Sequence, residues 1–487
     1  MLSAVRSHWV RIRSGQSEGD PVCTVGHRIR LPDGSSDGIY AGWHWNGREL
    51  VVEQDRYGFF PLFESRAGDA RMLSTDLVAL LDHGAPPELD LDALAVFVRV
   101  GFFVGADTPF RSIRAVLPPP LPRRRLEITR DEAVESFIEL FRRSIERRLP
   151  SGPFAMPLSG GRDSRHILFA LRDAGHPPTA CVTVRHFPPR VNDDEVIAGE
   201  ICRALGIEHR VLSQPRDRVV LERRKNRATH LCTEEHAHFV VLADYLRANT
   251  RETYDGIAGD VLSQSTYLRP EVHAMFTRAD YDGVAKFVLD GYGITMSERA
   301  LDRVLAPELR RKLTRERALA RLSAEIARHA DAANPIGSFF LNSRTRREIA
   351  LAPYGLMRDV TVHAPYLDRD LYDFLASLPA ELLMDRALHT DAIARAWPQH
   401  TNLPYERKGL KVQDRWAQRR TAAGALAALA RERSSSFLRR STLLPLLAAT
   451  VLDGAAERLW PAALVFYFDQ LAEAAAMRPM AARRRDR

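Results

Sequence analysis

The chain has 487 residues, of which 45% are hydrophobic and 27% are charged. This length allows two or more domains with separate cores, and the composition is that of an ordinary globular protein. No apolar stretch reaches the roughly 18 residues that a membrane helix needs, and the N-terminal segment lacks the continuous apolar run of a secretory signal. We therefore expect a soluble, cytoplasmic protein that has no membrane partner.

The formal net charge is +8, and part of the basic excess lies in short arginine runs. Such runs can hold phosphates or an acidic peptide. They lack the interleaved aromatic residues that are expected of a single-strand nucleic-acid groove. A solvated arginine surface is the better interpretation, so we expect no nucleic-acid partner.

The four cysteines, Cys23, Cys181, Cys202 and Cys232, stand alone in the sequence without a C-x-x-C pair. This spacing argues against a zinc site and against a redox pair. We expect reduced thiols that are mostly buried.

The first ~120 residues contain short alternating hydrophobic runs separated by turn residues, a pattern typical of strands. The predicted strands are Val22–Arg30, Ile39–Trp45, Leu50–Gln54 and Phe59–Phe63. A short helix is predicted over Asp90–Val100, whose apolar residues keep helical spacing. The pattern indicates an α+β or layered β module, and a proline cluster at Pro118–Pro120 marks its end. We place the boundary near residue 125, which gives domains 1–125 and 126–487.

The second domain is predicted to begin with a helix at about Asp131–Arg148 and then to alternate strands and helices. The predicted strands are Pro153–Leu158, Ala180–Phe187 and Thr253–Ala258, and the helices are Asp163–Ala174, Asp194–Leu205 and Glu235–Ala248. Such alternation predicts an α/β fold, in which helices cover a parallel sheet and ligands bind beyond the carboxyl ends of its strands. The remainder, roughly 280–480, is predicted to be mainly helical.

The strongest functional signal is Leu158-Ser159-Gly160-Gly161-Arg162-Asp163-Ser164, at the turn from a strand into a helix. The glycines let the backbone approach a ligand, and amide N–H groups with the Ser159 and Ser164 hydroxyls would form an anion cradle. No Gly-Lys-Ser/Thr follows, so the segment is not a Walker P-loop. Asp163 would repel phosphates unless a divalent cation lay between them, which points to Mg²⁺. The alternative is a plain strand–turn–helix junction.

Ser-Gly-Gly-x-Asp-Ser resembles the signature of the ATP pyrophosphatases, which cleave ATP to AMP and pyrophosphate. Other stretches are similar to motifs of the asparagine-synthetase superfamily: Asp193-Asp194-Glu195 with Ala198, Gly256-Ile257-Ala258-Gly259-Asp260, and Ala364-Pro365-Tyr366-Leu367-Asp368. In the N-terminal part, Asp55-Arg56-Tyr57-Gly58 with Pro61-Leu62, and Leu73-Ser74-Thr75-Asp76, resemble that family's glutaminase domain. The resemblance spans most of the chain, and only the last 70 or so residues are weakly matched.

This resemblance implies an Ntn-like α+β layered domain followed by a parallel-sheet ATP-pyrophosphatase domain of the adenine nucleotide α hydrolase type, with a mainly helical C-terminal part. It also implies the site. ATP would bind to Leu158, Ser159, Gly160, Gly161, Asp163, Ser164 and Gly259, and Mg²⁺ to Asp163 and Asp260. Lys408 follows Leu403-Pro404 as the family's lysine follows a similar segment, and it would stabilise the developing charge, with Lys411 as the reserve.

The chain also departs from the family. A working glutaminase domain needs a cysteine at its mature N-terminus, where this sequence has Leu2, and Cys23 could serve only after removal of everything before it. We expect a degenerate glutaminase-like domain, which argues against glutamine as the nitrogen donor. In the second domain the family's glutamate falls near Thr361 and its arginine near His363, which suggests a substrate other than aspartate.

Relatives with the same missing cysteine include β-lactam and carbapenam synthetases and the cyclases that close the macrolactam of lasso peptides. The resemblance therefore implies a ligase that activates a small-molecule or peptide carboxylate as its adenylate and forms an amide, with a precursor peptide as one candidate partner. Tyr354 and Glu348 are candidates for the base that deprotonates the amine, although core packing of Tyr354 and surface charge at Glu348 are the better interpretations. His363 is more often a structural histidine than a base.

Three alternatives stay open. An asparagine synthase that uses ammonia is the default for this fold. A tRNA-modifying ATP pyrophosphatase would explain the basic charge, but it should carry an RNA-binding domain or catalytic cysteines. A non-catalytic relative that binds ATP or a peptide should have a broken loop, whereas the loop here is intact.

Overall fold

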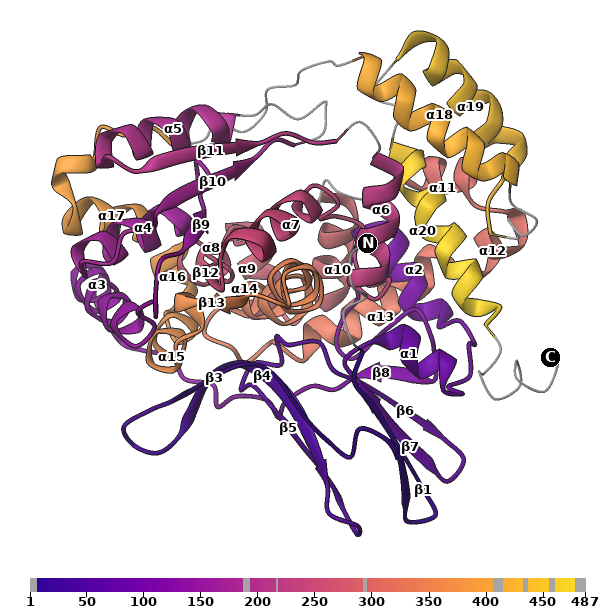
Figure 1. Cartoon of the computed structure of the whole chain (residues 1–487), viewed down its shortest axis with the longest axis horizontal. Coiled ribbons are helices and arrows are strands. Elements are labelled where there is room, and N and C mark those ends of the chain that lie inside the picture. Colours follow the sequence, from indigo (N-terminus) through magenta and orange to yellow (C-terminus); the bar gives the residue numbers. More distant parts are fainter. Residues whose placement is uncertain are drawn as a thin grey trace.

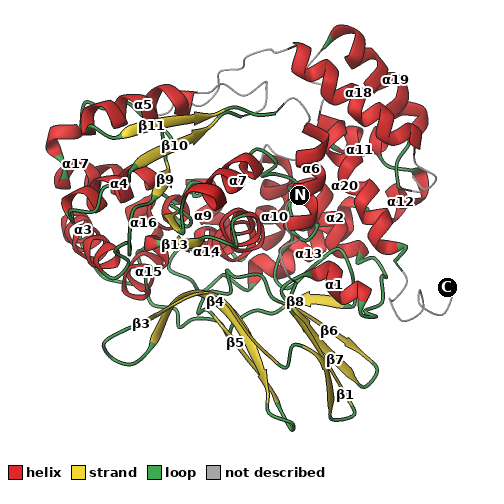
Figure 2. Ribbon diagram, in the orientation of Figure 1, coloured by secondary structure: helices red, strands yellow, loops and turns green. Residues whose placement is uncertain are grey.

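A computed structural model of the chain describes residues 7–186, 193–215, 218–291, 296–405, 415–431, 437–454 and 460–477. The structure is a mixed α/β protein in which antiparallel sheets lie at one end and helices surround short parallel strands in the rest (Figures 1 and 2). No helix among these residues is long and apolar enough to cross a membrane.

Two antiparallel sheets form the N-terminal part, with strand orders β2-β1-β7-β6-β8 and β3-β4-β5. Their strands are β1 (Trp9–Arg13), β2 (Gln16–Gly19), β3 (Val22–Arg30), β4 (Ser36–Trp45), β5 (Leu50–Gln54), β6 (Phe63–Ala67), β7 (Ala70–Ser74) and β8 (Ile113–Ala115). The helices are α1 (Leu77–Asp82) and α2 (Leu91–Val100). The side chains of Asp76 and Asp90 accept N–H hydrogen bonds at the two helix starts, as helix caps do.

The predicted strand at Phe59–Phe63 is wrong for all but its last residue, where β6 begins. The cause is the buried carboxylate of Asp55, which accepts hydrogen bonds from the backbone N–H groups of Tyr57, Phe59 and Phe60. These hydrogen bonds hold the chain in a turn, and the same N–H groups cannot pair with a neighbouring strand. The other three predicted strands correspond to β3, β4 and β5.

The predicted parallel sheet is confirmed, with β9 (Ala155–Pro157), β10 (Ala180–Val184) and β11 (Glu208–Leu212) in the order β11-β10-β9. A second parallel pair joins β12 (Glu252–Tyr254) and β13 (Thr361–His363). The Thr253 hydroxyl donates to the carbonyl of Ala155 at 2.8 Å, so β12 lies beside β9. The strand order therefore reverses between β9 and β12, which is where open α/β sheets bind ligands.

The helices of this region are α3 (Arg130–Glu146), α4 (Asp163–Asp173), α5 (Asp193–Leu205), α6 (Arg218–Ala228), α7 (Phe239–Asn249) and α8 (Gly259–Ser263). A capping box formed by Thr129 and Glu132 starts α3. The predicted helix at Glu235–Ala248 begins four residues late, at Phe239. His236 has a φ of +78°, which belongs to the left-handed region, so the helix cannot start before it.

The C-terminal part is mainly helical, as predicted. The α-helices are α9 (Pro270–Thr277), α10 (Tyr281–Gly291), α11 (Glu298–Val304), α12 (Pro307–Lys312), α13 (Arg315–Ala327), α14 (Pro335–Phe340), α15 (Arg369–Ala376), α16 (Ala380–Leu383), α17 (Leu388–Ala396), α18 (Arg415–Arg431), α19 (Arg440–Asp453) and α20 (Trp460–Ala475). Two π-helical segments, η1 (Leu341–Ile349) and η2 (Ala352–Leu356), follow α14. Two short 3-10 helices are η3 (Pro365–Leu367) and η4 (Pro398–His400).

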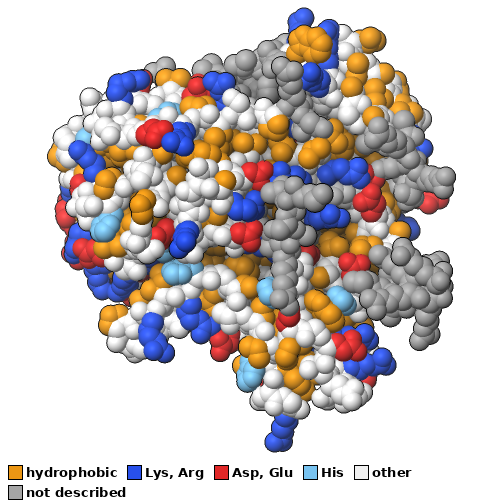
Figure 3. Space-filling view, in the orientation of Figure 1, with side chains coloured by type: hydrophobic (Ala, Val, Ile, Leu, Met, Phe, Trp, Pro, Cys, Tyr) orange, Lys and Arg blue, Asp and Glu red, His pale blue; other side chains and the backbone are white. Residues whose placement is uncertain are grey.

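Many arginines form ion pairs at the surface, for example Arg142 with Glu139 and Glu146 on α3. On the face shown in Figure 3, basic side chains are scattered among acidic and hydrophobic ones. This arrangement agrees with a solvated arginine surface.

A buried ion-pair cluster joins the N-terminal sheets to the second half of the chain. Arg148, just after α3, contacts Asp37 of β4 at 2.5 Å and Asp368 at 2.6 Å, and all three side chains are buried. Burial alone would lower the pKa of Arg148, but the two carboxylates raise it above its ordinary value. Asp368 also caps α15 by accepting from backbone N–H groups. The aspartate of the Ala-Pro-Tyr-Leu-Asp segment is therefore a structural residue.

We predict that Arg148→Ala lowers the free energy of unfolding by about 3–5 kcal/mol, because it leaves two buried carboxylates without their partner. The matched control is Arg142→Ala on the exposed face of α3, which should change stability little. Urea unfolding of the two variants measures the difference. Equal stability of the two variants would contradict the structural role of Arg148.

Candidate functional site

The signature loop leaves β9 and folds back on the first turn of α4. The Thr183 hydroxyl donates to the Leu158 carbonyl at 2.7 Å and fixes the end of the strand. Beyond it, the Ser159 N–H donates to the hydroxyl oxygen of Ser164 at 3.2 Å, and the two serine hydroxyls lie 3.3 Å apart. The sequence thus places both hydroxyls beside the N-terminus of α4, as predicted.

Two amide groups of the loop already have partners inside the protein. The Gly160 N–H donates to Asp194 Oδ1 at 2.7 Å, and the Gly161 N–H donates to Ser159 Oγ at 3.2 Å. Asp194 comes from the first turn of α5, which explains the acidic motif at this place in the sequence. The donors that remain for an anion are the first N–H groups of α4, which have no partner within the helix, and the serine hydroxyls.

The loop after β12 approaches Asp163 so closely that only glycine fits. A Cβ atom at Gly256 would lie 2.5 Å from Asp163 Cβ, and one at Gly259 would lie 2.5 Å from Asp163 Oδ1. Between these glycines, Ala258 has a φ of +72°, in the left-handed region. The two predicted motifs therefore meet at one point, where the carboxyl ends of β9 and β12 share an edge.

Asp163 is a partly buried acid, with a side chain that is 24% exposed, and it forms no ion pair with an arginine or lysine among the described residues. Its Oδ1 has no hydrogen-bond partner among the described residues. Burial raises the pKa of Asp163 well above its ordinary value, and the nearby Asp260 and Asp255 raise it further, while Arg162 opposes the shift. Burial also raises the pKa of Asp255, to about 6. An acid that is repelled by two neighbouring carboxylates is in an environment that a bound cation would stabilise.

The predicted metal ligands Asp163 and Asp260 are brought together by this junction, where the charge of Asp260 helps to raise the pKa of Asp163. Within the described ranges no group of three or more His, Cys, Asp or Glu side chains could hold a metal ion. Mg²⁺ usually binds through one or two carboxylates and completes its shell with phosphate oxygens and water. The pair therefore fits a cation that arrives with a phosphate group.

A buried polar network lies beneath Asp163. The Tyr366 hydroxyl is 3.3 Å from His166 Nδ1, 3.1 Å from His389 Nε2 and 3.4 Å from the Asp163 carbonyl. His389 Nδ1 lies 2.9 Å from the Ser263 hydroxyl and 3.3 Å from Asp163 Oδ1. Because burial lowers the pKa of His389 to about 3, this ring is neutral and supplies no counter-charge to Asp163.

His166 and His389 were not predicted from the sequence. His166 lies one helical turn after Asp163, and His389 comes from α17, 223 residues further along the chain. Neither belongs to a motif, so no signal in the single sequence could have identified them. Both rings are linked to the Asp163 carbonyl through the Tyr366 hydroxyl.

The segment that precedes the predicted lysines lies against α4. Arg165 donates from Nη1 to the Leu403 carbonyl at 3.1 Å, and the Tyr405 ring stacks on the guanidinium groups of Arg162 and Arg165. Lys408 and Lys411 lie outside the described residues. The chain is thus held at the edge of the loop just before the segment that contains them.

The predicted base candidates do not join this site through any hydrogen bond between described residues. Glu348 is buried and paired with Arg344 at 3.0 Å, so its interpretation as a surface charge is wrong. Burial raises the pKa of Glu348 to about 8. Tyr354 is buried, in agreement with core packing. His363 pairs with Glu252 at 3.0 Å, which agrees with a structural histidine.

All four cysteines are free and buried, as predicted. Cys23 lies in β3 opposite Trp43 of β4. A thiol buried in a sheet is not accessible to a substrate.

A comparison with family models finds no match, and a comparison with curated proteins finds none either. Among solved structures, the chain is similar to NMN synthetase from Francisella tularensis at 18% sequence identity and a TM-score of 0.22. The similarity covers 41% of this chain and 93% of that chain. A TM-score of this size supports no conclusion on fold or function.

We predict that Gly256→Ala lowers the free energy of unfolding by about 1–3 kcal/mol, because its Cβ would collide with the Cβ of Asp163, which the backbone of α4 fixes in place. Gly152→Ala is the matched control, since a Cβ there meets no atom within 4 Å. Urea unfolding compares them. If both variants are as stable as the wild type, the two loops do not approach as described.

Proposed function

We propose that the chain is an ATP-dependent amide ligase that activates a carboxylate as its acyl-adenylate and releases pyrophosphate and AMP. The observation that carries this proposal is the junction at Asp163, where a partly buried acid, whose Oδ1 atom is buried without a hydrogen-bond partner, lies beside two serine hydroxyls and a helix N-terminus. Anions bind at helix N-termini. An acid in the same place is explained by a divalent cation between it and the phosphates.

In the first step, the substrate carboxylate oxygen attacks the α-phosphorus of ATP, and the bond to the bridging oxygen breaks as pyrophosphate leaves. The first N–H groups of α4 and the hydroxyls of Ser159 and Ser164 would hold the phosphates. Mg²⁺ on Asp163 and Asp260 would neutralise phosphate charge when it is bound. The network of His166, Tyr366 and His389 keeps the loop in position during this step.

In the second step, an amine nitrogen attacks the acyl carbon, loses a proton, and displaces AMP to leave an amide. Lys408, with Lys411 as the reserve, is our proposal for the cation that stabilises the developing oxyanion. The anchoring of Leu403–Tyr405 on α4 supports this choice, because these residues directly precede that segment.

The nitrogen donor is, in our proposal, an amine or ammonia that does not come from glutamine. Cys23 is buried and cannot act as the nucleophile of a glutaminase. The N-terminal domain would then be a glutaminase-like scaffold, as in β-lactam synthetases and lasso-peptide cyclases. The carboxylate belongs to a small molecule or a peptide, and a precursor peptide is the partner that would make the chain a macrolactam cyclase.

We predict that ATP·Mg²⁺ gives AMP and pyrophosphate in equal amounts with the correct carboxylate, and that Asp163→Asn lowers the rate at least about 100-fold. Removal of Mg²⁺ with a chelator should abolish both products. The control is Asp282→Asn, an exposed acid in the first turn of α10. Nucleotides are separated by chromatography across candidate carboxylates, including aspartate with ammonia.

Formation of ADP in place of AMP would contradict the proposal, as would full activity of Asp163→Asn. AMP formation with aspartate and ammonia would identify an asparagine synthase. Tight binding of ATP·Mg²⁺ without turnover of any carboxylate would favour the non-catalytic relative.

A further inference from the structure

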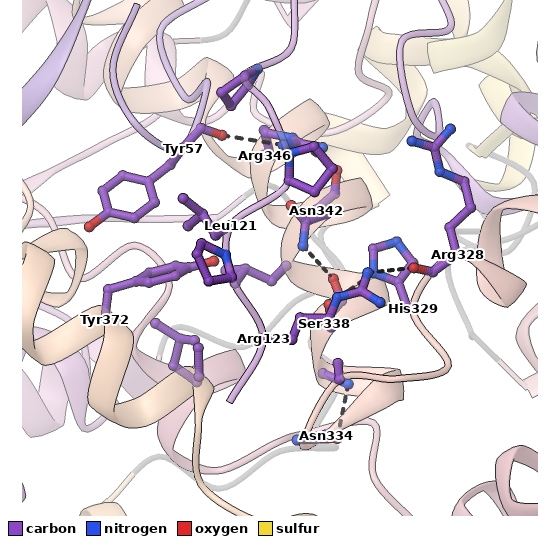
Figure 4. A pocket seen from close by; sticks show the side chains of 18 of the residues that line it. Tyr57, Leu121, Arg123, Arg328, His329, Asn334, Ser338, Asn342, Arg346 and Tyr372 are labelled. Atoms are coloured by element: carbon purple, nitrogen blue, oxygen red, sulfur yellow. Dashed lines mark hydrogen bonds between the residues drawn. The ribbon is translucent and has the colours of Figure 1, made fainter. Parts of the chain in front are cut away.

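A large cavity lies between the N-terminal domain and the helices of the second domain. Its volume is about 1230 Å³, and its wall includes the proline-rich segment Leu117–Pro122 and parts of α13, α14, η1 and α15 (Figure 4). Val261 and Leu262 of α8 also line it. The same helix begins at Gly259, which touches Asp163. The cavity therefore lies close to the nucleotide loop but has residues of its own.

The charge of the cavity is positive. Seven arginines and three carboxylates line it. Each carboxylate already has an arginine partner: Asp373 pairs with Arg56 at 2.9 Å, Glu325 with Arg321 at 3.1 Å, and Asp331 with Arg123. Arg114 pairs with Asp107 at 2.7 Å. Among the described residues, this leaves Arg124, Arg328 and Arg346 of the lining without an ion pair.

Arg346 is the clearest of these unneutralised arginines. Its Nε donates to the Asn342 carbonyl at 3.1 Å and its Nη1 to the Tyr57 carbonyl at 3.3 Å (Figure 4). No carboxylate among the described residues lies within ion-pair distance, and its Nη2 has no protein partner in that part of the chain. Burial and the neighbouring Arg347 lower the pKa of Arg346, to about 10. A partly buried guanidinium without a counter-ion loses part of its hydration, and an anionic ligand would offset that cost.

Other groups of the wall suit a ligand that is partly polar and partly apolar. His329 is 6% exposed, and its Nδ1 lies 2.8 Å from the Ser338 hydroxyl. Its Nε2 has no hydrogen-bond partner among the described residues. Opposite it, the prolines and Leu121 give an apolar surface that offers few N–H groups.

We propose that this cavity binds a peptide segment with acidic side chains, and that Arg346 is the counter-ion of one carboxylate. The volume exceeds the roughly 300–1,000 Å³ of sites for drug-sized ligands, which favours several residues over a single amino acid. The proposal rests on the proposed function, since the segment is then part of the carboxylate substrate whose reacting group reaches the loop past α8. It adds a substrate class, acidic peptides, and a residue that selects it.

The test is fluorescence polarisation with a labelled short peptide of alternating glutamate and alanine, and with its neutral twin in which glutamine replaces glutamate. The wild type should bind the acidic peptide at least about 10-fold more tightly, and Arg346→Gln should remove this preference. Arg346→Lys should keep part of it, because the charge remains. Arg142→Gln, on the outer face of α3, is the control and should keep all of it.

Arg346 also links the two domains through Tyr57, so thermal unfolding must show that its variants are folded. Arg328→Gln is the second variant, because Arg328 lines the cavity, is exposed, and forms no ion pair with another described residue. It should reduce the acidic preference in a protein whose domain contact is intact. Equal binding of the two peptides by the wild type would overturn the proposal, and so would an acidic preference that both variants retain.

Failure here is distinguishable from failure of the proposed function. Asp163→Asn should bind the acidic peptide normally while it loses AMP formation. If the wild type makes ADP from ATP, the proposed ligase mechanism is contradicted, whereas a preference for the acidic peptide can still be observed. If AMP and pyrophosphate form but the wild type does not prefer the acidic peptide, only the proposal for the cavity is contradicted.

Discussion

The close approach of two loops at Asp163 is the constraint on which the rest of the structure depends. Since β9 and β12 lie side by side at the reversal of strand order, the loops that leave them must share one edge of the sheet. Only the missing Cβ atoms of Gly256 and Gly259 allow them to meet. The contact desolvates Asp163 and leaves one carboxylate oxygen unpartnered, and this energetic cost is understandable if the site binds a cation and phosphates.

The segment from Tyr366 to Asp368 connects this junction to the N-terminal sheets. Tyr366 enters the network beneath Asp163, and Asp368 pairs with Arg148, which also holds Asp37 of the N-terminal sheet. A short stretch of chain thus contacts the signature loop through Tyr366 and, through Asp368 and Arg148, the N-terminal sheets. The cavity with Arg346 is lined by residues from the N-terminal part and from the later helices, and Arg346 donates to the Tyr57 carbonyl.

The sequence predicted those features that depend on local residues. The serines and glycines of the signature loop, the helices α2 and α3, and the β3–β5 strands were found where expected, because their causes lie within a few positions of the chain. The predicted strand at Phe59–Phe63 was wrong because the buried carboxylate of Asp55 accepts hydrogen bonds from backbone N–H groups of this segment. Only the fold brings His389 and Arg346 to their sites, and the burial of Glu348 likewise comes from tertiary packing.

The central claim is that the junction at Asp163 binds the triphosphate of ATP. A crystal structure of the wild type with Mg²⁺ and a non-hydrolysable ATP analogue tests it most directly. Our account predicts triphosphate density against the first turn of α4 and a metal ion between the phosphates and the side chains of Asp163 and Asp260. Density for the analogue elsewhere, for example in the interdomain cavity, or an empty junction at saturating nucleotide, would contradict it.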